Sequence, residues 1–297
     1  MKLTRNLFFI LLLFSFNAIS QNKEFELPSI KKEDEIVYHQ GYTLSYNEKY
    51  EQANWVAYVL TEEKTHNLFS RTNKFLEDPQ VSTGSADNDD YQGSGYDRGH
   101  LAPAADMEWS AVAVKESFYY SNMSPQVPAF NRGIWKHLEE FVREAAVKNK
   151  VIYVVTGPVL SDPLPTIGHH HVAVPKYYYK VILDYQDPEK KGIGFLLPNE
   201  NSKEPLANFS VSIDSVEKIT HINFFPMLTK EEENVLEKTF DINKWQIQKS
   251  SPHHFNPIDQ SINIQSDNVV QCTAMTKKGK RCRNMTKNSN GLCHLHQ

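Results

Sequence analysis

The chain has 297 residues, of which 40% are hydrophobic and 11% aromatic, enough apolar material for one large domain with a small appendage. Its formal net charge of −4 at first argues against a polyanionic substrate. That average hides an uneven distribution, because residues 21–270 carry 24 basic and 36 acidic side chains, whereas residues 271–297 carry six basic and no acidic ones. We therefore expect an acidic body and a basic tail with different electrostatic behaviour.

The first twenty residues are typical of a secretory signal peptide. Lys2 and Arg5 precede an apolar run over residues 7–16, and small residues follow before an expected cleavage near Gln21. The run is short for a transmembrane helix, which needs about 20 apolar residues, and no later stretch approaches that length. We expect a secreted or periplasmic protein with no membrane segment after cleavage; an N-terminal anchor that is retained is the alternative.

The body predicts a mixture of strands and helices. Runs of β-branched and aromatic residues that end at turn residues predict strands over 53–61, 150–160, 175–185 and 192–199. Helices are predicted over 111–120, over 132–149, and after Thr229, where TKEE has the spacing of a capping box. Because these elements show no repeating βαβ order, we predict an α+β fold rather than a doubly wound sheet.

The helix predicted over 132–149 carries two rows of side chains. The first row has core-facing spacing and comprises Ile134, Leu138, Phe141 and Ala145. The second row has a spacing of four and comprises Asn131, Trp135, Glu139 and Arg143. An ordinary solvent-exposed helix face would also show such residues, so this row alone does not distinguish a functional site from an exposed face.

Distance along the helix limits how the second row could bind a metal ion. Asn131 and Glu139 would lie about 12 Å apart along an unbroken helix, too far to share the first shell of one ion. We expect Asn131, near the helix start, to offer its carbonyl oxygen to a hard cation, and Glu139 to hold metal-bound waters. One protein ligand plus several waters suits Mg²⁺, with Mn²⁺ as a substitute.

The segment DRGH, residues 97–100, supplies the other groups that phosphodiester cleavage needs. His100 has an ordinary pKa near 6.5 and could accept a proton from water. Arg98, two positions earlier, shares its face on an extended chain and could neutralise a phosphate, while Gly99 permits close backbone approach. Asp97 is expected to hold the loop geometry, because a bare carboxylate would repel a phosphate.

Three ordered motifs resemble a known family: DRGHLAPAA at 97–105, SFYYSNMSPQ at 117–126 and FNRGIWKHLEEFVR at 130–143. They resemble the DNA/RNA non-specific endonucleases, ββα-metal nucleases with a DRGH signature. The similarity extends from about Tyr38 to Phe225. It implies a central, mostly antiparallel sheet flanked by helices, with the site in a ββα unit.

The resemblance also implies a role for each matching residue. His100 corresponds to the general base, Asn131 to the direct magnesium ligand, and Glu139 to the acid that organises metal-bound waters. The residues expected near phosphate are Arg71, Arg98 and Arg143, and Asn122 is expected to support the loop. The implied activity is hydrolysis of DNA and RNA with little sequence preference. A non-catalytic nucleic-acid-binding protein and a phosphodiesterase for another substrate are the alternatives. No pattern predicts an oligomeric state or an inhibitor protein.

The end of the chain predicts a separate module. Polar, aperiodic residues over 257–270 predict a linker, so the nuclease domain would span 21–256 and the module 271–297. The module contains C-x9-C-x10-C-x2-H, formed by Cys272, Cys282, Cys293 and His296, which could bind a structural Zn²⁺ tetrahedrally. A Cys272–Cys282 disulfide is the alternative in an exported protein. The consecutive histidines 169–171 instead predict a surface turn, because adjacent residues do not easily converge on one ion.

Overall fold

The computed structural model describes residues 24–161, 163–247, 270–275, 281–282, 285–286, 290–293 and 296. The predicted signal peptide lies outside these residues, as does the predicted linker except for Val270. Within the described part of the chain, no helix combines the length and the apolar character that crossing a membrane requires.

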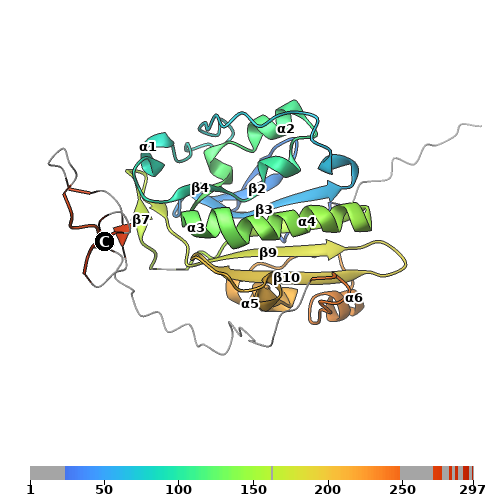
Figure 1. The fold of residues 1–297 in the computed structure, drawn as a ribbon. Coiled ribbons are helices and arrows are strands. Elements are labelled where there is room, and N and C mark those ends of the chain that lie inside the picture. Colours follow the sequence, from blue (N-terminus) through green and yellow to red (C-terminus); the bar gives the residue numbers. More distant parts are fainter. Residues whose placement is uncertain are drawn as a thin grey trace, which may run out of the picture.

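A seven-stranded sheet forms the centre of the molecule (Figure 1). In chain order its strands are β1 (Glu35–Tyr38), β2 (Thr43–Asn47), β3 (Gln52–Thr61), β6 (Val151–Pro158), β9 (Tyr177–Asp184), β10 (Lys191–Pro198) and β11 (Ser210–Val211). The order across the sheet is β1-β2-β3-β6-β9-β10-β11, and every neighbouring pair is antiparallel. The predicted antiparallel α+β architecture and all four predicted strands are confirmed.

Helices cover both faces of the sheet, which Figure 1 shows with α4 on one side and α5 and α6 on the other. The helices are α1 (Asn88–Tyr91), α2 (Ala111–Glu116), α3 (Pro128–Phe130), α4 (Lys136–Asn149), α5 (Ile213–Thr220) and α6 (Lys230–Leu236). The predicted capping box of α6 is present, because Thr229 and Glu232 bond reciprocally. The helix predicted over 111–120 is shorter than expected and ends at Glu116; just beyond it, Asn122 Nδ2 donates to the backbone oxygen of Ser117 at 2.8 Å.

Strand β9 explains why the central strands are apolar at nearly every position. Tyr178 and Ile182 pack in the core beneath α4, whereas Tyr179 and Val181 pack in the core beneath α5. Alternate side chains of a strand point to opposite faces, so a strand covered on both faces needs apolar residues throughout. Lys180 breaks this pattern: it lies on the α4 face and is 0% exposed.

A ββα unit is built beside the sheet, as the resemblance implies. Strand β4 (Asp97–His100) pairs antiparallel with β5 (Met123–Gln126), and α3 follows. A π turn over Asn131–Trp135 then joins α3 to α4, with Gly133 outside helical values at φ −110° and ψ −114°. Such turns widen a helix locally and recur at functional sites.

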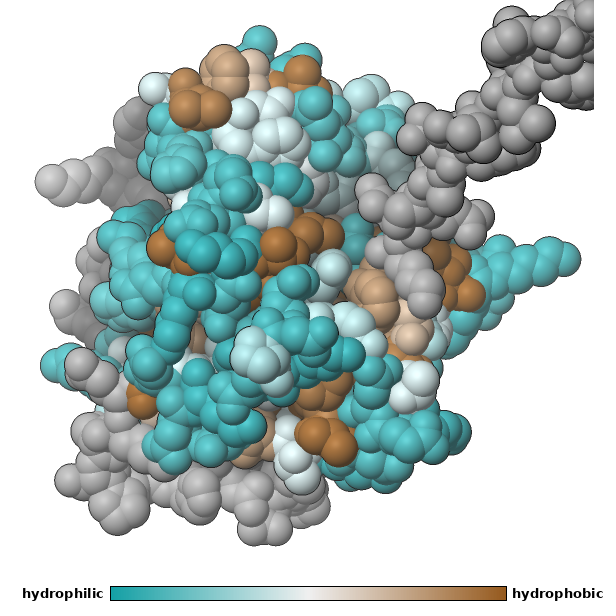
Figure 2. Space-filling view, turned by 90° about the vertical axis from the view of Figure 1, so that its right-hand side faces the viewer, coloured by the Kyte–Doolittle hydropathy of each residue, from teal (hydrophilic) through white to brown (hydrophobic). Residues whose placement is uncertain are grey.

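The remaining strands form short hairpins outside the central sheet: β7 (Thr166–Ile167) with β8 (Val172–Ala173), and β12 (Val270–Gln271) with β13 (Met285–Thr286). Figure 2 shows the face at the right-hand side of Figure 1, which is covered mainly by hydrophilic side chains, with apolar ones in small separate groups. Scattered apolar residues of this kind are normal on a folded domain and do not by themselves mark a binding surface.

Candidate active site

Strand β4 is fastened to the following helical segment at both of its ends. At its start, the Asp97 carboxylate accepts a hydrogen bond from Asn131 Nδ2 at 2.9 Å. At its end, the backbone oxygen of His100 accepts a bond from Trp135 Nε1 at 3.4 Å. These two contacts place His100 and Asn131 in one ββα unit. They also agree with the prediction that Asp97 holds the local geometry.

The glycine between Arg98 and His100 is required by close packing. Gly99 is buried and paired with Ser124, and a Cβ added to it would lie 2.2 Å from the side chain of Gln126. No real side chain tolerates such a contact without a shift of its neighbours. Because β4 is extended, Arg98 and His100 both point to the opposite face, away from Gln126.

His100 lies among aromatic rings. The imidazole centre is 4.9 Å from the Phe118 ring, edge to face, and 5.9 Å from the Phe75 ring. Burial, and to a smaller extent the positive charge of Arg71, lower the pKa of His100 to about 3. Its Nε2 atom is buried and has no hydrogen-bond partner among the described residues. A neutral imidazole with an unpaired nitrogen can accept a proton from a bound molecule.

Two of the predicted phosphate-binding arginines flank this histidine. Arg98 stands over the Phe75 ring at 5.3 Å, and Arg71 over the Phe118 ring at 5.5 Å. Arg98 donates to Tyr120 Oη at 3.0 Å and to Asn88 Oδ1 at 2.7 Å. Arg71 is exposed and donates to Asn73 Oδ1 at 2.8 Å. Within the described residues, the hydrogen-bond partners of the two guanidinium groups are neutral, so both keep their charge available to an anion.

Asn122 supports the loop that follows His100. It is fully buried; its Oδ1 accepts from the backbone nitrogen of Ala102 and its Nδ2 donates to the backbone oxygen of the same residue, both at 2.9 Å. Because these two bonds hold the nitrogen and the oxygen of one residue, they fix the position and the orientation of the Ala102 backbone. The loop therefore leaves the end of β4 in one direction.

The second helical row is not a solvated face. Trp135 is 0% exposed and packs beside Tyr178 of the sheet, and Glu139 is half-buried on the same side. Burial raises the pKa of Glu139, and the positive charge of Lys180 opposes that rise. Lys180 Nζ stands 4.9 Å from the Trp135 ring centre and has no hydrogen-bond partner among the described residues.

Arg143 lies at the far end of the row in an ion pair. Its Nη1 donates to the buried carboxylate of Asp106 at 2.9 Å, and Tyr58 Oη donates to the other oxygen at 2.8 Å. The Arg143 side chain is 22% exposed, so one side of it still reaches solvent. That Arg143 lies near phosphate stays a prediction. The structure shows in addition that the Asp106 carboxylate holds its guanidinium group.

The residues present fit a hard cation that keeps most of its waters. The bond from Asn131 Nδ2 to Asp97 turns the amide so that Oδ1 faces away from Asp97. An amide oxygen with a carboxylate further along the helix is the kind of oxygen-donor set that Mg²⁺ takes. These residues would hold the ion through Asn131 Oδ1 and through waters bonded to Glu139.

Several interactions near the site were not predicted from the sequence. Phe75 and Phe118 support the histidine and the arginines, and Lys180 and Asp106 neutralise charges of the helical row. Of these residues, only Lys180 could have been noticed in the sequence, because it is a lysine inside a run of apolar strand residues. The other contacts depend on loops and on sheet order.

Two further clusters of ionisable side chains lie outside this site. Residues 169–171 lie in an exposed turn, as predicted, and two of these histidines contact Asp90, which bonds His170 Nδ1 at 2.8 Å and lies 3.4 Å from His169 Nδ1. Together with Asp87 these atoms lie within 4.8 Å of one another, and the bond between His170 and Asp90 joins two of the four residues. Asp214, Glu217 and Glu237 form an acidic cluster. The four predicted tail ligands are also brought together, as described below.

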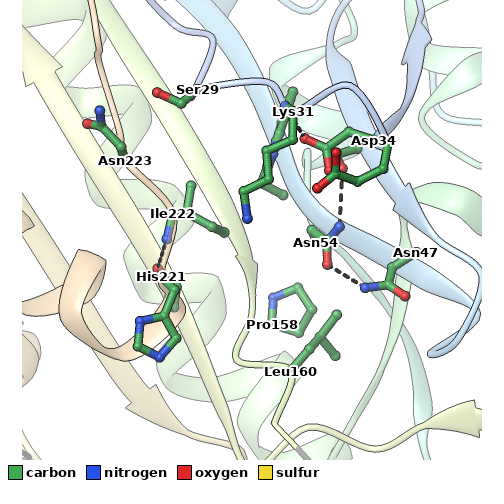
Figure 3. A pocket seen from close by; sticks show the side chains of 14 residues that line it. Ser29, Lys31, Asp34, Asn47, Asn54, Pro158, Leu160, His221, Ile222 and Asn223 are labelled. Atoms are coloured by element: carbon green, nitrogen blue, oxygen red, sulfur yellow. Dashed lines mark hydrogen bonds between the residues drawn. The ribbon is translucent and has the colours of Figure 1, made fainter.

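A polar pocket of about 380 Å³ opens at a different place, between β2, β3 and the segment after α5 (Figure 3). Three of its polar side chains bond one another: Asn47 Nδ2 donates to Asn54 Oδ1 at 2.7 Å, as Figure 3 shows, and Asn54 Nδ2 donates to Ser45 Oγ at 3.1 Å. Neither His100 nor Asn131 lines it. The groups predicted to act on phosphate therefore lie outside this pocket.

Comparison with known proteins agrees with this geometry. The sequence model of the family described as DNA/RNA non-specific endonuclease matches residues 21–231. Nuclease C1 of Cunninghamella echinulata var. echinulata is 42% identical over 206 residues, covering 64% of this chain and 82% of that protein. Mitochondrial endonuclease G of Homo sapiens is 36% identical over 202 residues, covering 63% of this chain and 68% of that protein.

A solved structure shares the fold as well. The crystal structure of an EndoG/EndoGI complex, described as showing the mechanism of EndoG inhibition, aligns with a TM-score of 0.65 at 31% identity. The alignment covers 73% of this chain and 93% of that one. With the match over residues 21–231, the chain belongs to the DNA/RNA non-specific endonuclease family, a family of metal-dependent nucleic-acid hydrolases.

Proposed function

We propose that this protein is a magnesium-dependent endonuclease that hydrolyses phosphodiester bonds of DNA and RNA with little sequence preference. One observation carries the proposal: β4 is fastened at both ends to the π turn and α4, by Asp97–Asn131 and by His100–Trp135. This arrangement holds the neutral imidazole of His100 and the amide of Asn131 on one structural unit. Manganese, which also takes oxygen ligands, is expected to substitute for magnesium.

His100 takes the proton from the attacking water at Nε2. Its lowered pKa keeps the imidazole neutral throughout the near-neutral range, which is the form that a base requires. Arg98 and Arg71 bind the phosphate beside it and stabilise the negative charge that develops on the phosphoryl oxygens. When bound, the dication supplies further charge stabilisation of the phosphate. All these groups address the backbone, so base sequence is expected to matter little.

The test is cleavage of supercoiled plasmid and of RNA during a Mg²⁺ titration, with bis(p-nitrophenyl) phosphate as a small diester. The wild type should cleave both nucleic acids only with metal present. His100→Ala should lose about 10²- to 10⁴-fold or more in rate with an unchanged circular dichroism spectrum. His137→Ala is the matched control, because His137 lies on α4 with its side chain 67% exposed and should keep the wild-type rate.

The outcomes separate the alternatives. Binding of plasmid without metal-dependent nicking would support a non-catalytic protein, and cleavage of the small diester alone would support another phosphodiesterase. The pH profile adds a further check at saturating Mg²⁺. With His100 titrating at about 3, kcat/KM should show no limb near 6.5; a persistent limb there would contradict the proposed state of this base.

We also propose export to the periplasm or beyond the cell, on the basis of the first twenty residues. N-terminal sequencing of the mature protein should begin near Gln21, and activity should appear in the periplasmic or culture fraction. A mature chain that still begins at Met1 in the membrane fraction would support the retained anchor instead.

A further inference from the structure

Four metal-ligating side chains converge in the basic tail. Cys272, Cys282, Cys293 and His296 each offer one ligand atom, and these atoms all lie within 4.8 Å of one another. The cysteines are buried, at 0%, 5% and 1% exposed. They are also the three cysteines of the whole chain, so every thiol of this protein belongs to the cluster.

The distances between the sulfur and nitrogen atoms of these side chains match the edges of a tetrahedral zinc site. Zinc bonds of about 2.3 Å to sulfur and about 2.0 Å to nitrogen give edges of about 3.8 Å between two sulfurs and about 3.6 Å between sulfur and nitrogen. Cys282 Sγ and Cys293 Sγ lie 3.8 Å apart. His296 Nδ1 lies 3.7 Å from Cys272 Sγ and 3.2 Å from Cys293 Sγ. A disulfide needs about 2.05 Å between its sulfurs, so Cys282 and Cys293 are not arranged as one.

Backbone contacts hold the ligands in place around this centre. The backbone nitrogen of Cys293 donates to Cys272 Sγ at 3.2 Å, and Arg281 Nε donates to the backbone oxygen of Cys272 at 3.1 Å. The backbone nitrogen of Cys282 donates to Ala274 O at 2.7 Å. An N–H bond to sulfur favours the thiolate over the thiol, which is the form that binds a metal ion.

The tail has almost no apolar core of its own. The three cysteines pack with Ala274 and Leu292 in the small cluster that the described residues form there. So few apolar contacts do not offset the entropy cost of ordering the segment. A segment of this size needs a metal ion or a disulfide to fold. Four protein ligands also leave no open position, which distinguishes a structural site from a catalytic one.

We propose that Cys272, Cys282, Cys293 and His296 bind one structural Zn²⁺ and that the tail folds around it. The site stands apart from the nuclease site in its chemistry, since it presents three sulfurs and a nitrogen where the other presents oxygens. Soft ligands select zinc over magnesium. The inference therefore does not depend on the proposed nuclease activity and is tested without it.

The first experiment measures metal content in the full chain, purified without chelator. Plasma mass spectrometry should find one zinc per wild-type chain, and Cys272→Ser and His296→Ala should each lose it. His294→Ala is the matched control, because His294 is two positions from His296 and outside the C-x2-H spacing; it should keep the zinc. Zinc retained by Cys272→Ser, or lost from His294→Ala but kept by His296→Ala, would overturn the ligand assignment.

The second experiment separates zinc from a disulfide and does not require the variants to fold. Iodoacetamide added to the denatured wild-type chain, without reductant, should modify all three cysteines in an intact-mass measurement. A single modified cysteine would show a disulfide and refute the proposal. In the native protein, a thiol-blocking mercurial should release one equivalent of zinc to a chromogenic chelator; no release would refute it equally.

Discussion

Asp97 offers the sharpest test of how the site is built, because it touches the expected metal ligand but is not expected to touch substrate. Its carboxylate accepts from Asn131 Nδ2 at 2.9 Å and from Arg132 at 2.7 and 2.8 Å. In Asp97→Ala the amide of Asn131 loses the bond that sets its orientation. Losing a partner that orients a metal ligand typically costs 10- to 100-fold in metal affinity, about 1.4–2.8 kcal/mol.

The free energy of a single hydrogen bond leads to a similar estimate, since hydrogen bonds to a charged group contribute about 1.5–3 kcal/mol. The measurement is the Mg²⁺ midpoint of plasmid cleavage, which should rise about 10- to 100-fold in Asp97→Ala. Arg132→Ala is the control: it removes the ion pair with a side chain 72% exposed, worth about 1 kcal/mol or less, so its midpoint should rise less than about fivefold. Equal shifts in the two variants, or no shift in Asp97→Ala, would refute the orienting role.

Three other predictions follow from single contacts. Because burial raises the pKa of Glu139 above its ordinary 4.5, it is protonated below that raised pKa and ionised above it, so apparent Mg²⁺ affinity should increase with pH through this window; Glu139→Gln should flatten the dependence, and an unchanged slope would exclude Glu139 as its source. Gly99→Ala should lower the free energy of unfolding by about 1–3 kcal/mol in urea titrations, since its Cβ meets Gln126, and Gln126→Ala should restore part of the loss. Deleting residues 271–297 removes six cations, so the slope of log affinity for DNA against log salt should become shallower by up to about 5; an identical slope would exclude backbone binding by the tail.

The central sheet is predictable because its strands are buried on both faces. Such strands, β9 among them, are apolar at nearly every position, with Lys180 as the exception inside β9. Strands β1 and β2 are four and five residues long and mix polar with apolar positions, so they carry little signal. Helix α5 spans eight residues, fewer than a periodic pattern needs to stand out.

The local parts of the site are predictable and its long-range contacts are not. The face shared by Arg98 and His100 follows from the period of an extended chain, and the row that contains Glu139 follows from the period of a helix. The contact between Asp97 and Asn131 joins residues 34 apart in sequence, and Lys180, whose charge opposes the pKa rise of Glu139 on α4, comes from strand β9. Such contacts depend on the order of the strands, which no local pattern encodes.

The acidic body binds a polyanion in this proposal because charge is compensated locally at the site. Asp97 is paired with Arg132, Asp106 with Arg143, and Glu139 is opposed by Lys180. Within the described residues, neither Arg98 nor Arg71 has an acidic partner, since their guanidinium groups bond an amide, a hydroxyl or both. After burial, the charge of Arg71 is the second cause of the lowered pKa of His100, which agrees with an uncompensated cation beside it. A phosphate approaching β4 therefore meets two free cations rather than the average charge of the chain, and the net charge says little about the substrate.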